Sequence, residues 1–576
     1  MQLIKLYSNQ KSFHTINFKP GVNFIVGEAT QENKSNIQKT YNSVGKSLLV
    51  KLIDFCFACE SVEEFEEKLP DWEFSLEFEL KGKNYISTRN TSRQKKIILN
   101  GEELTLDEFR DTFALKVFNL AEPVDYLTWR TLISHFIRPR KSSYHSFDKT
   151  YSKETDYSKL VNTAYLLGLN IDLIGKKKEL KVELDRVDTL KKNLETDEIF
   201  KRYFTQNKDI DIEIIDLEDK IKDLKKILES FEVSDSYYQM QRDADQLKYE
   251  GQITKNKITL LKNSVRNIDK SLEIRIDIEP DTIIKLYEEA QKELPKSIVK
   301  EIKEVSDFHQ NLISKRKKRL LENKSNLLEE IKVLEKGREE LGKKVDEILQ
   351  FLGKHKALDE FVAINEKLTS FNTNLEKLKT YKGLLQEYKN KMEEIEIELK
   401  QENITTNNYL DETYPTLEKN INTFRTLSKE FYDNKAGGIE VKSNDGKNQL
   451  RFNINVHIDD DTSDGVNEVK IFCFDMTLLL TKHNHSMDLI LHDSRLFSNV
   501  DPRQVATLFR LANQYSASKK IQYIATVNQN QIEPLSEFYS KEEYKKYIKD
   551  NVVLTLTDAS DEAKLLGVQV NLDYEK

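Results

Sequence analysis

The sequence predicts an α/β protein whose globular domain is assembled from the N- and C-terminal halves of the chain and is split by a long antiparallel coiled-coil hairpin. The first observation is compositional: the 576 residues include 17 glycines and 9 prolines, and 33% are charged. Ordinary globular chains contain about 7% glycine, about 5% proline and about 25% charged residues. The bias is typical of long, solvated helices, because helix interiors tolerate glycine and proline least.

The second observation is the position of the prolines. Two long stretches, 140–279 and 296–414, contain none. A helix interior excludes proline because its ring clashes with the preceding turn and its nitrogen carries no hydrogen. Two proline-free arms around a short interval predict a helical hairpin over 171–430 with its tip near 280–295.

Heptad spacing predicts a coiled coil in the second arm. Seven of the eight positions in one 4-3 series are apolar, and the series comprises Leu327, Ile331, Leu334, Arg338, Leu341, Val345, Ile348 and Leu352. Such a repeat forms the seam along which helices pair. We expect Gly251, Gly353 and Gly383 to mark bends. The alternative is a compact helical bundle, which would need shorter helices and more turns.

The third observation is that β-rich runs occur only near the two ends of the chain. The predicted strands are Leu3–Tyr7, Val22–Val26, Phe74–Leu80, Tyr85–Thr88, Lys96–Leu99, Gly438–Val441, Leu450–Ile458, Asp488–His492, Ile521–Thr526, Val552–Thr557 and Gly567–Asn571. Helical patterns lie between them. A hairpin returns the chain to its starting point, so 1–170 and 431–576 are expected to form two halves of one domain.

A phosphate-binding loop is predicted in the N-terminal half. The strand Val22–Val26 ends at Gly27, and a Gly-Lys-Ser sequence later opens an apolar helix, an order typical of phosphate loops. Helix N–H groups and the helix dipole would face the phosphates, Lys46 would reach the β/γ oxygens, and the Ser47 hydroxyl would bind Mg²⁺. The candidate residues are Gly27, Asn42, Ser43, Val44, Gly45, Lys46, Ser47 and Leu48.

The spacing within this loop is unusual. Seventeen residues separate Gly27 from Gly45, where four residues are usual, and the intervening polar sequence is interpreted as an excursion that leaves the loop and returns. The alternative is a chance Gly-Lys-Ser. The strand before it, the helix after it and the nearby Asn42 favour the phosphate loop.

Three C-terminal segments could complete a nucleotide site. The apolar run Leu489–His492 is followed by Asp493, and an acid at the end of such a strand commonly belongs to the Mg²⁺ shell opposite a phosphate loop. The segment Ser498–Asp501 follows, and Ser463-Asp464-Gly465 precedes a helix upstream.

This arrangement resembles the SMC, RecN and SbcC type of ABC ATPase, whose head is split by a coiled coil. Ser463 and Gly465 resemble the Ser-x-Gly of the signature motif, Leu489–Asp493 resembles Walker B, and Ser498–Asp501, including Asp501, resembles the D-loop. The strings NSVGKS, VKIFCFDMTLLL and LILHDSRLF resemble a bacterial SMC-like family annotated mainly as a domain of unknown function. Members occur in three-component conflict systems thought to act against phage. The resemblance implies ATP and Mg²⁺ as cofactors, with Ser47 and Asp493 as metal ligands.

The sequence departs from the family at the catalytic positions. Ser494 stands where the glutamate that polarises the attacking water is expected, and a serine cannot act as that base near neutral pH. If the Walker B motif is shifted by one residue, His492 takes the position of the Mg²⁺-binding acid and Asp493 takes the position of the catalytic glutamate. The spacing to the D-loop then fits the family less well, by one residue. Val527-Asn528 replaces the switch histidine, and no Q-loop glutamine is identifiable. Hydrolysis is therefore expected to be slow, partner-dependent or absent.

One phosphate loop and one signature per chain imply, by the same resemblance, that two heads sandwich ATP. The expected partners are a second copy or a related head, DNA, and separate effector and adaptor proteins. Two alternatives remain: a RecN- or SbcC-like DNA-repair ATPase, and a non-hydrolysing coiled-coil scaffold that binds nucleotide for assembly. The net charge of −8 is uninformative about DNA.

Several classes of protein are excluded by simpler features. No run of about 18 apolar residues is present, the N-terminus lacks a signal-peptide core, and three cysteines cannot form a disulfide framework. We expect a cytoplasmic protein without membrane contact. Cys56-x-x-Cys59 could belong to a zinc site, but packing of a buried helical turn is the alternative.

The basic segment Phe136–Lys141 could contact DNA, or it could be a solvated loop. His483, His485 and His492 could form a metal site, or His483 and His485 could be exposed loop residues.

Overall fold

The computed structural model describes residues 1–29, 44–196, 209–229, 235–273, 298–352, 357–433, 435, 437–458, 464–570 and 572. The described chain divides into two compact units. The first contains Met1–Lys181, residues 298–301 and Leu399–Lys576, and the second is made from the described helices within Val182–Leu286 and Ile302–Glu398. Each unit is described by itself below.

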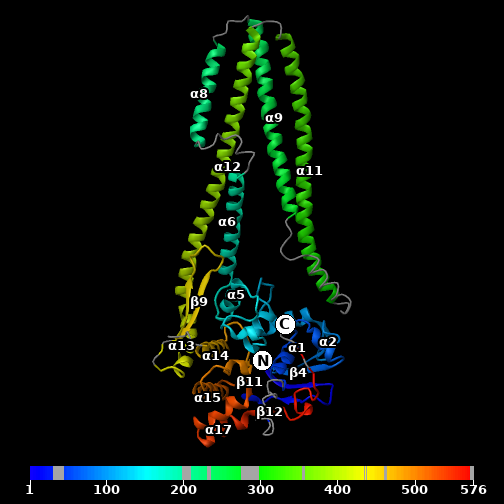
Figure 1. Ribbon diagram of the computed structural model, residues 1–576, viewed down its shortest axis with the longest axis vertical. Helices are drawn as coiled ribbons and strands as arrows, with labels where there is room; N and C mark the ends of the chain where they lie inside the picture. The colour runs from blue at the N-terminus through cyan, green and yellow to red at the C-terminus, as the bar shows by residue number, and fades with distance from the viewer. Residues whose placement is uncertain are drawn as a thin grey trace. The chain divides into compact units, whose positions relative to one another are not determined.

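The first unit contains a parallel sheet to which both ends of the chain contribute. Its order is β10 (Leu489–His492), β11 (Gln522–Asn528), β3 (Val22–Glu28) and β12 (Val552–Thr557), and all neighbours run parallel. The N-terminal strand β3 thus lies between two C-terminal strands, β11 and β12, both of which are labelled in Figure 1. Their apolar runs are typical of parallel strands that are covered on both faces. The four strands predicted in these segments are confirmed.

A second, antiparallel sheet comes entirely from the N-terminal segment. Its order is β2 (Ile16–Asn17), β1 (Gln2–Ser8), β4 (Glu73–Leu80), β5 (Lys83–Asn90), β6 (Lys96–Leu99) and β7 (Glu102–Thr105). β2 and β7 are not predicted by the sequence pattern, because strands of two and four residues are too short to show an alternation. The C-terminal segment adds the two-stranded pair β8 (Gly437–Ser443) and β9 (Phe452–Ile458).

One predicted strand is wrong. Residues 567–570 of the expected strand Gly567–Asn571 form no strand, and Asn571 lies outside the described residues. Gly567 has φ +65°, and a side chain there would collide with the backbone of Ser12. The segment therefore makes a close turn against the N-terminal part of the chain instead of pairing with a sheet.

Helices from both segments share one hydrophobic core with the sheets. They are α1 (Lys46–Cys56), α2 (Glu63–Lys68), α3 (Leu106–Phe118), α4 (Trp129–Ile137), α5 (Asp156–Leu166), α13 (Tyr414–Lys429), α14 (Asp464–Thr481), α15 (Pro502–Lys519), α16 (Gln529–Ile532) and α17 (Lys541–Tyr547). The core extends from Met1 to Ile174 and from Leu417 to Leu566. Phe24 of β3 packs against Phe509 of α15 with ring centroids 4.7 Å apart. In this core, the pair is one of the direct contacts between the N-terminal and C-terminal segments of the chain.

The long helices are α6 (Asp172–Thr196), α8 (Ile210–Glu229), α9 (Asp235–Glu273), α11 (Ile298–Leu352) and α12 (Ala357–Glu412). Ion pairs join α9 to α11 and α8 to α12: Lys257–Glu330 at 2.8 Å, Lys262–Glu335 at 2.6 Å, Lys324–Asp269 at 2.5 Å and Lys379–Glu218 at 2.8 Å. In every pair, the mean of the two residue numbers is close to 296. A nearly constant mean is expected when a helix pairs antiparallel with one that comes later in the chain. The predicted tip near 280–295 itself lies outside the described residues.

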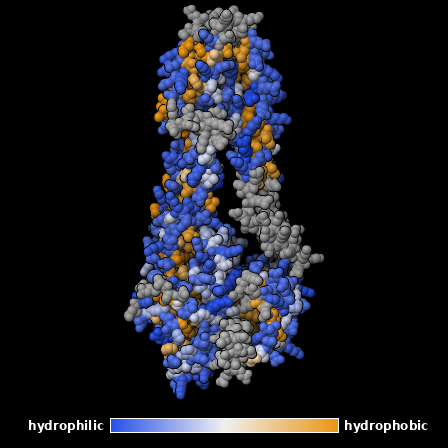
Figure 2. All heavy atoms as spheres, viewed as in Figure 1, coloured by the Kyte–Doolittle hydropathy of each residue, from blue (hydrophilic) through white to orange (hydrophobic). Residues whose placement is uncertain are grey.

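The predicted coiled-coil seam is the less exposed side of α11. Ile331 and Val345 are buried, with 5% and 8% of their surface exposed, while the polar member of the series, Arg338, is exposed. Figure 2 shows a mainly hydrophilic visible face on the long helices, with apolar side chains scattered over it. Gly251 and Gly383 lie inside α9 and α12, which continue through them, and Gly353 lies outside the described residues. None of the described helices combines the length and the apolar character needed to cross a membrane.

Candidate functional site

The site lies where strands of the parallel sheet end. Asp493 follows the last residue of β10, and Ser47 belongs to the first turn of α1, the helix that follows β3. The Ser47 hydroxyl donates a hydrogen bond to Asp493 Oδ2 at 2.8 Å. Residues 446 positions apart are thus joined, because β3 and β10 run in the same direction and their carboxyl ends meet at one edge of the sheet.

The N-terminus of α1 is shaped to accept an anion. Gly45 is the N-cap, with φ 105°, a conformation that favours glycine, and its lack of a side chain leaves no cap for the first-turn N–H groups. The first turn contains no acidic residue. A Cβ at Gly45 would collide with Leu565. The first-turn N–H groups therefore have no side-chain cap, and together with the positive end of the helix dipole they would suit phosphate oxygens.

Lys46 lies against Gly27. A Cβ at Gly27 would collide with the Lys46 ammonium, so a side chain there would have to displace the end of this lysine. Lys46 has 3% of its surface exposed, and burial lowers the pKa of its ammonium to about 8, although the nearby Asp493 carboxylate opposes the shift. A bound phosphate would stabilise the charged ammonium and raise its pKa again, so the lysine suits an anionic ligand.

Hydrogen bonds hold the Asp493 carboxylate in place. Its Oδ1 accepts from Thr526 Oγ1 at 2.6 Å and from the Ser494 N–H at 2.7 Å, and its own N–H donates to Tyr144 Oη at 2.7 Å. The Arg495 guanidinium lies 3.4 Å from Oδ2. This leaves Oδ2, the oxygen bonded to Ser47, as the one that faces the phosphate loop. A hydroxyl and a carboxylate oxygen are the hard ligands that Mg²⁺ prefers.

His492 belongs to a different, buried network. Its Nε2 lies 3.0 Å from Asp475 Oδ2, and its Nδ1 lies 3.0 Å from the Tyr523 hydroxyl. The ring is fully buried, and burial lowers its pKa, although the Asp475 carboxylate opposes the shift. His492 therefore points away from Ser47, whereas Asp493 points toward it.

Asp475 is fixed by Arg138. The guanidinium Nε and Nη2 donate to the two carboxylate oxygens at 2.5 and 2.6 Å, and both side chains are fully buried. Burial opposes ionisation of Asp475, but Arg138 and His492 outweigh it and hold the pKa of that carboxyl below its usual value. Arg138 belongs to the basic segment Phe136–Lys141, for which the sequence predicts either a DNA contact or a solvated loop. At Arg138 neither prediction holds, because this side chain is buried and paired with Asp475.

A short chain of hydrogen bonds positions Ser494. Its N–H lies 3.0 Å from Thr526 Oγ1 as well as 2.7 Å from Asp493 Oδ1, and its carbonyl accepts from Gln531 Nε2 at 3.0 Å. Gln531 in turn accepts from the Asn528 N–H at 2.9 Å. The end of β11, where Val527-Asn528 replaces the expected switch histidine, therefore supports the turn that carries Ser494.

The signature-like and D-loop-like segments contact each other. A Cβ at Gly465 would lie 2.8 Å from the carbonyl oxygen of Asn499, so glycine is required for this approach. Asp501 caps α15 and forms an exposed ion pair with Arg503 at 2.9 Å. In the part of the chain that the structure describes, neither Gly465 nor Asp501 hydrogen-bonds to Ser47 or Asp493. Asn42, Ser43 and Ser463 lie outside the described residues, while Val44 and Leu48 are buried beside the loop.

The weaker predictions do not produce a metal centre. Within the described ranges, no group of three or more His, Cys, Asp or Glu side chains could hold a metal ion. Cys56 and Cys59 are buried and free, and the Cys56 thiol donates to the Phe74 carbonyl at 3.4 Å. The expectation of an exposed His485 is wrong: its ring has 6% of its surface exposed and packs edge-on against Phe136.

Three supporting residues were missed by sequence reasoning. Thr526 and Tyr144 both hydrogen-bond to Asp493, and Asp475 anchors His492. Thr526 could have been found, because it lies near the end of a predicted strand beside the Asp493 strand. Tyr144 and Asp475 carry no local signal, since each acts through contacts with segments distant in the sequence.

Residues 427–570 match a family described as "Uncharacterised protein conserved in bacteria (DUF2326)". A comparison with curated proteins gives no match.

Three solved structures that resemble the chain are described as Smc heads. The Smc head domain with a coiled coil and joint derived from Pyrococcus yayanosii is 14% identical, with a TM-score of 0.39, and the match covers 100% of this chain and 98% of that one. The Smc head with an extended coiled coil from Pyrococcus furiosus, bound to the C-terminal domain of ScpA, is 11% identical, with a TM-score of 0.34 and coverage of 93% and 91%. An SmcHead bound to the C-winged helix domain of ScpA is 9% identical, with a TM-score of 0.36 and coverage of 92% and 90%. At these values the likeness transfers no function, so the residues of the site must carry the functional conclusion.

Proposed function

We propose that the chain is an SMC-like protein that binds Mg²⁺–ATP and is a slow or partner-dependent ATPase. The observation that carries this proposal is the 2.8 Å hydrogen bond between Ser47 Oγ and Asp493 Oδ2. A serine directly after Gly-Lys at a helix N-terminus, joined to an acid at the end of a neighbouring parallel strand, is the pairing that a Mg²⁺–nucleotide site needs.

Each residue of the site has a distinct role in this proposal. The first-turn N–H groups of α1 and the Lys46 ammonium bind the phosphate oxygens, and Gly27 and Gly45 leave room for them. Ser47 and Asp493 hold Mg²⁺, which would offset negative charge on the phosphates. Thr526 and Tyr144 orient Asp493 from two sides. Asn42, Ser43 and Leu48 complete the loop.

The weak point of the site as a hydrolase is Ser494. No carboxylate follows Asp493, and the Ser494 side chain itself lies 3.2 Å from Asp493 Oδ1. A serine cannot accept a proton from water near neutral pH, so the catalytic base has to come from another group or from a partner. The missing base favours a second candidate function, in which the chain is a scaffold that binds nucleotide for assembly without hydrolysing it.

The segments around Gly465 and Asp501 support a head dimer. In the family that the sequence resembles, the signature of one head completes the ATP site of the other, and this resemblance implies a head dimer. In this proposal Ser463 and Gly465 face the nucleotide of the opposite head, and the helical hairpin over 171–430 clamps or senses DNA. Control of a separate anti-phage effector, with an adaptor protein, follows from the family resemblance.

The direct test measures Mg²⁺–ATP binding by calorimetry for the full chain and for Lys46→Ala. A charged hydrogen bond is worth about 1.5–3 kcal/mol, so the variant should bind ATP at least about tenfold more weakly. Lys68→Ala, which changes an exposed lysine on α2, should bind normally. Equal affinity in the wild type and Lys46→Ala would contradict the assignment.

Turnover and association separate the two candidate functions. ATP hydrolysis is measured with and without DNA ends, and sedimentation is measured with and without ATP. Turnover above background in either condition indicates an ATPase. ATP-driven dimerisation with background turnover in both conditions indicates the scaffold.

A further inference from the structure

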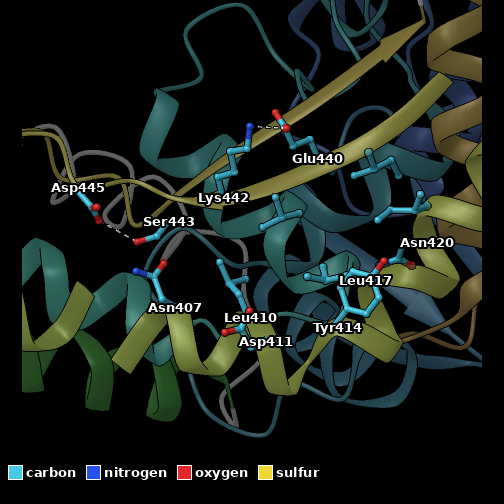
Figure 3. A pocket seen from close by; sticks show the side chains of 13 residues that line it. Asn407, Leu410, Asp411, Tyr414, Leu417, Asn420, Glu440, Lys442, Ser443 and Asp445 are labelled. Atoms are coloured by element: carbon cyan, nitrogen blue, oxygen red, sulfur yellow. Dashed lines mark hydrogen bonds and ion pairs between the residues drawn. The ribbon is translucent and has the colours of Figure 1, made fainter. Parts of the chain in front are cut away.

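A groove of about 540 Å³ lies in the first unit, away from the candidate nucleotide site. One wall is β8, and the other is the helical segment formed by the end of α12 and by α13 (Figure 3). The groove contains no residue of the phosphate loop or of the Asp493 turn. It is therefore a separate surface that the proposed ATP site does not use.

The groove follows the edge of β8 and not one of its faces. Five consecutive residues, Ile439–Ser443, line it. Successive residues of a strand point to opposite faces, so all five can border one groove only if it runs along the strand edge. β8 pairs over its whole length with β9 and with no other described strand. Alternate residues of β8 therefore present N–H and C=O groups toward the groove.

The helical wall presents one stripe of residues, of which Leu410, Tyr414, Leu417 and Ile421 are mainly apolar. Its residues recur at helical spacing: Asn407, Leu410, Asp411, Tyr414, Leu417 and Ile421. Leu410 and Ile421 are half-buried, and Tyr414 is 55% exposed although it is large and mostly apolar. Figure 3 shows Asn407 and Leu410 rising from the helix toward the strand. A chain lying in the groove would thus meet hydrogen-bonding groups on one side and apolar surface on the other.

The charges that line the groove are unbalanced. Glu440 and Lys442 neutralise each other in an ion pair at 2.5 Å. Asp411 and Asp445 are two further exposed carboxylates of the groove lining. Asp445 accepts a hydroxyl hydrogen bond from Ser443 and lies near the charged groups of Lys177 and Arg451, which do not line the groove. The groove therefore favours a basic occupant and disfavours a second copy of its own acidic edge.

We propose that this groove is a docking site for an extended, basic segment of a partner protein, which adds to β8 as a further strand. Its main chain bonds to the free edge of β8, its lysine or arginine side chains lie near Asp411 and Asp445, and its alternate apolar side chains pack on Leu410 and Tyr414. Strand addition of this kind takes its affinity from main-chain hydrogen bonds and its specificity from alternate side chains.

The probe is a labelled peptide, acetyl-Lys-Val-Lys-Val-Lys-Val-Lys-amide, titrated with the full chain and followed by fluorescence anisotropy. Saturable binding is expected, together with slower hydrogen exchange of the backbone amides of residues 439–443. A peptide with glutamate in place of lysine should not bind. A peptide N-methylated at alternate residues should lose about tenfold or more in affinity, because its main-chain donors are removed.

Variants of the chain test the same surface. Asp411→Lys combined with Asp445→Lys should weaken binding about tenfold or more, and Tyr414→Ala should also weaken it, while the exposed neighbour variant Glu412→Lys should not. If the double variant fails to fold, the N-methylated and acidic peptides still decide the question. Equal binding of all three peptides, unchanged exchange at 439–443, or self-association of the chain through β8 would each overturn the proposal.

Discussion

Arg138 places two guanidinium nitrogens on the carboxylate of Asp475 at 2.5 and 2.6 Å, with both side chains fully buried. The pair joins the C-terminal end of α4 to α14, two helices from opposite ends of the chain. Because Asp475 also contacts His492, the residue directly before Asp493, the pair supports the strand that carries the candidate metal ligand. Assembly of the two chain ends and formation of the site are thus coupled through one buried charge pair.

Asp475→Asn should be strongly destabilising. The substitution removes one partner of a buried ion pair and leaves the Arg138 charge without compensation, which typically costs about 3–5 kcal/mol. Denaturant unfolding measures the loss. The matched control is Glu430→Gln, which breaks the partly exposed pair Arg510–Glu430 and should cost less than about 1 kcal/mol. Equal losses in the two variants would show that the Arg138–Asp475 pair is not special.

Stability should fall as the pH decreases from about 6.5 toward 4. His135 has 1% of its surface exposed, and neither ring nitrogen has a hydrogen-bond partner in the described structure. Burial lowers its pKa from 6.5 to about 3, so below pH 6.5 the unfolded chain binds a proton that the folded chain refuses. Each such histidine lowers the free energy of unfolding by up to about 1.4 kcal/mol per pH unit within this window. Burial also lowers the pKa of His483 and His485 to about 4, which adds to the slope.

The histidine prediction is tested by urea unfolding at several pH values. His135→Phe removes one titrating group from the core and should flatten the fall of stability between pH 6.5 and 4. His145→Phe, which changes an exposed ring, should leave the slope unchanged. A slope that is the same in His135→Phe and in the wild type would rule out His135 as a contributor.

ATP affinity should fall as the pH rises above about 8. Burial lowers the pKa of Lys46 to about 8 in the free protein, so above this value the lysine must take up a proton before it can pair with phosphate. The dissociation constant should then rise by about tenfold per pH unit until the pKa of the bound state is reached. Calorimetry between pH 7 and 9.5 measures this rise. Lys46→Arg, which stays charged over the range, should remove most of it, and a pH-independent affinity in the wild type would contradict the prediction.

The parts of the site that lie within short motifs could be predicted from the sequence. Lys46 and Ser47 follow glycine at the start of a helix, and Asp493 ends an apolar strand, so each carries its signal in a few neighbouring residues. Tyr144 reaches Asp493 across 349 positions, and Arg138 reaches Asp475 across 337. Such contacts depend on how two chain ends pack, and no local pattern encodes them. The same reason explains Gly567, whose strand-like neighbours turn against Ser12 through tertiary contact.

Thr526→Val should weaken Mg²⁺-dependent ATP binding without changing the fold. Thr526 Oγ1 donates to Asp493 Oδ1 at 2.6 Å and accepts from the Ser494 N–H at 3.0 Å, so its loss frees the carboxylate to rotate. A hydrogen bond to a charged group is worth about 1.5–3 kcal/mol, which corresponds to at least about a tenfold loss of affinity. Affinity is compared with and without Mg²⁺. The control is Thr555→Val on the exposed side of β12, and equal effects in both variants would exclude a specific role for Thr526.

Ser494→Glu should raise ATP turnover if the chain is a hydrolase limited by its missing base. The Ser494 backbone is held by Asp493, Thr526 and Gln531, so a longer side chain would project from a fixed turn beside the phosphate loop. A general base contributes about 10²–10⁴-fold to rate, and even a poorly aligned carboxylate should give an increase of at least about tenfold. Turnover is measured with saturating Mg²⁺–ATP, and Ser494→Gln, which has the same size and no basic group, is the control. If the glutamate and glutamine variants both remain at the wild-type rate while ATP still binds, the missing carboxylate is not what limits hydrolysis, and the scaffold function is favoured.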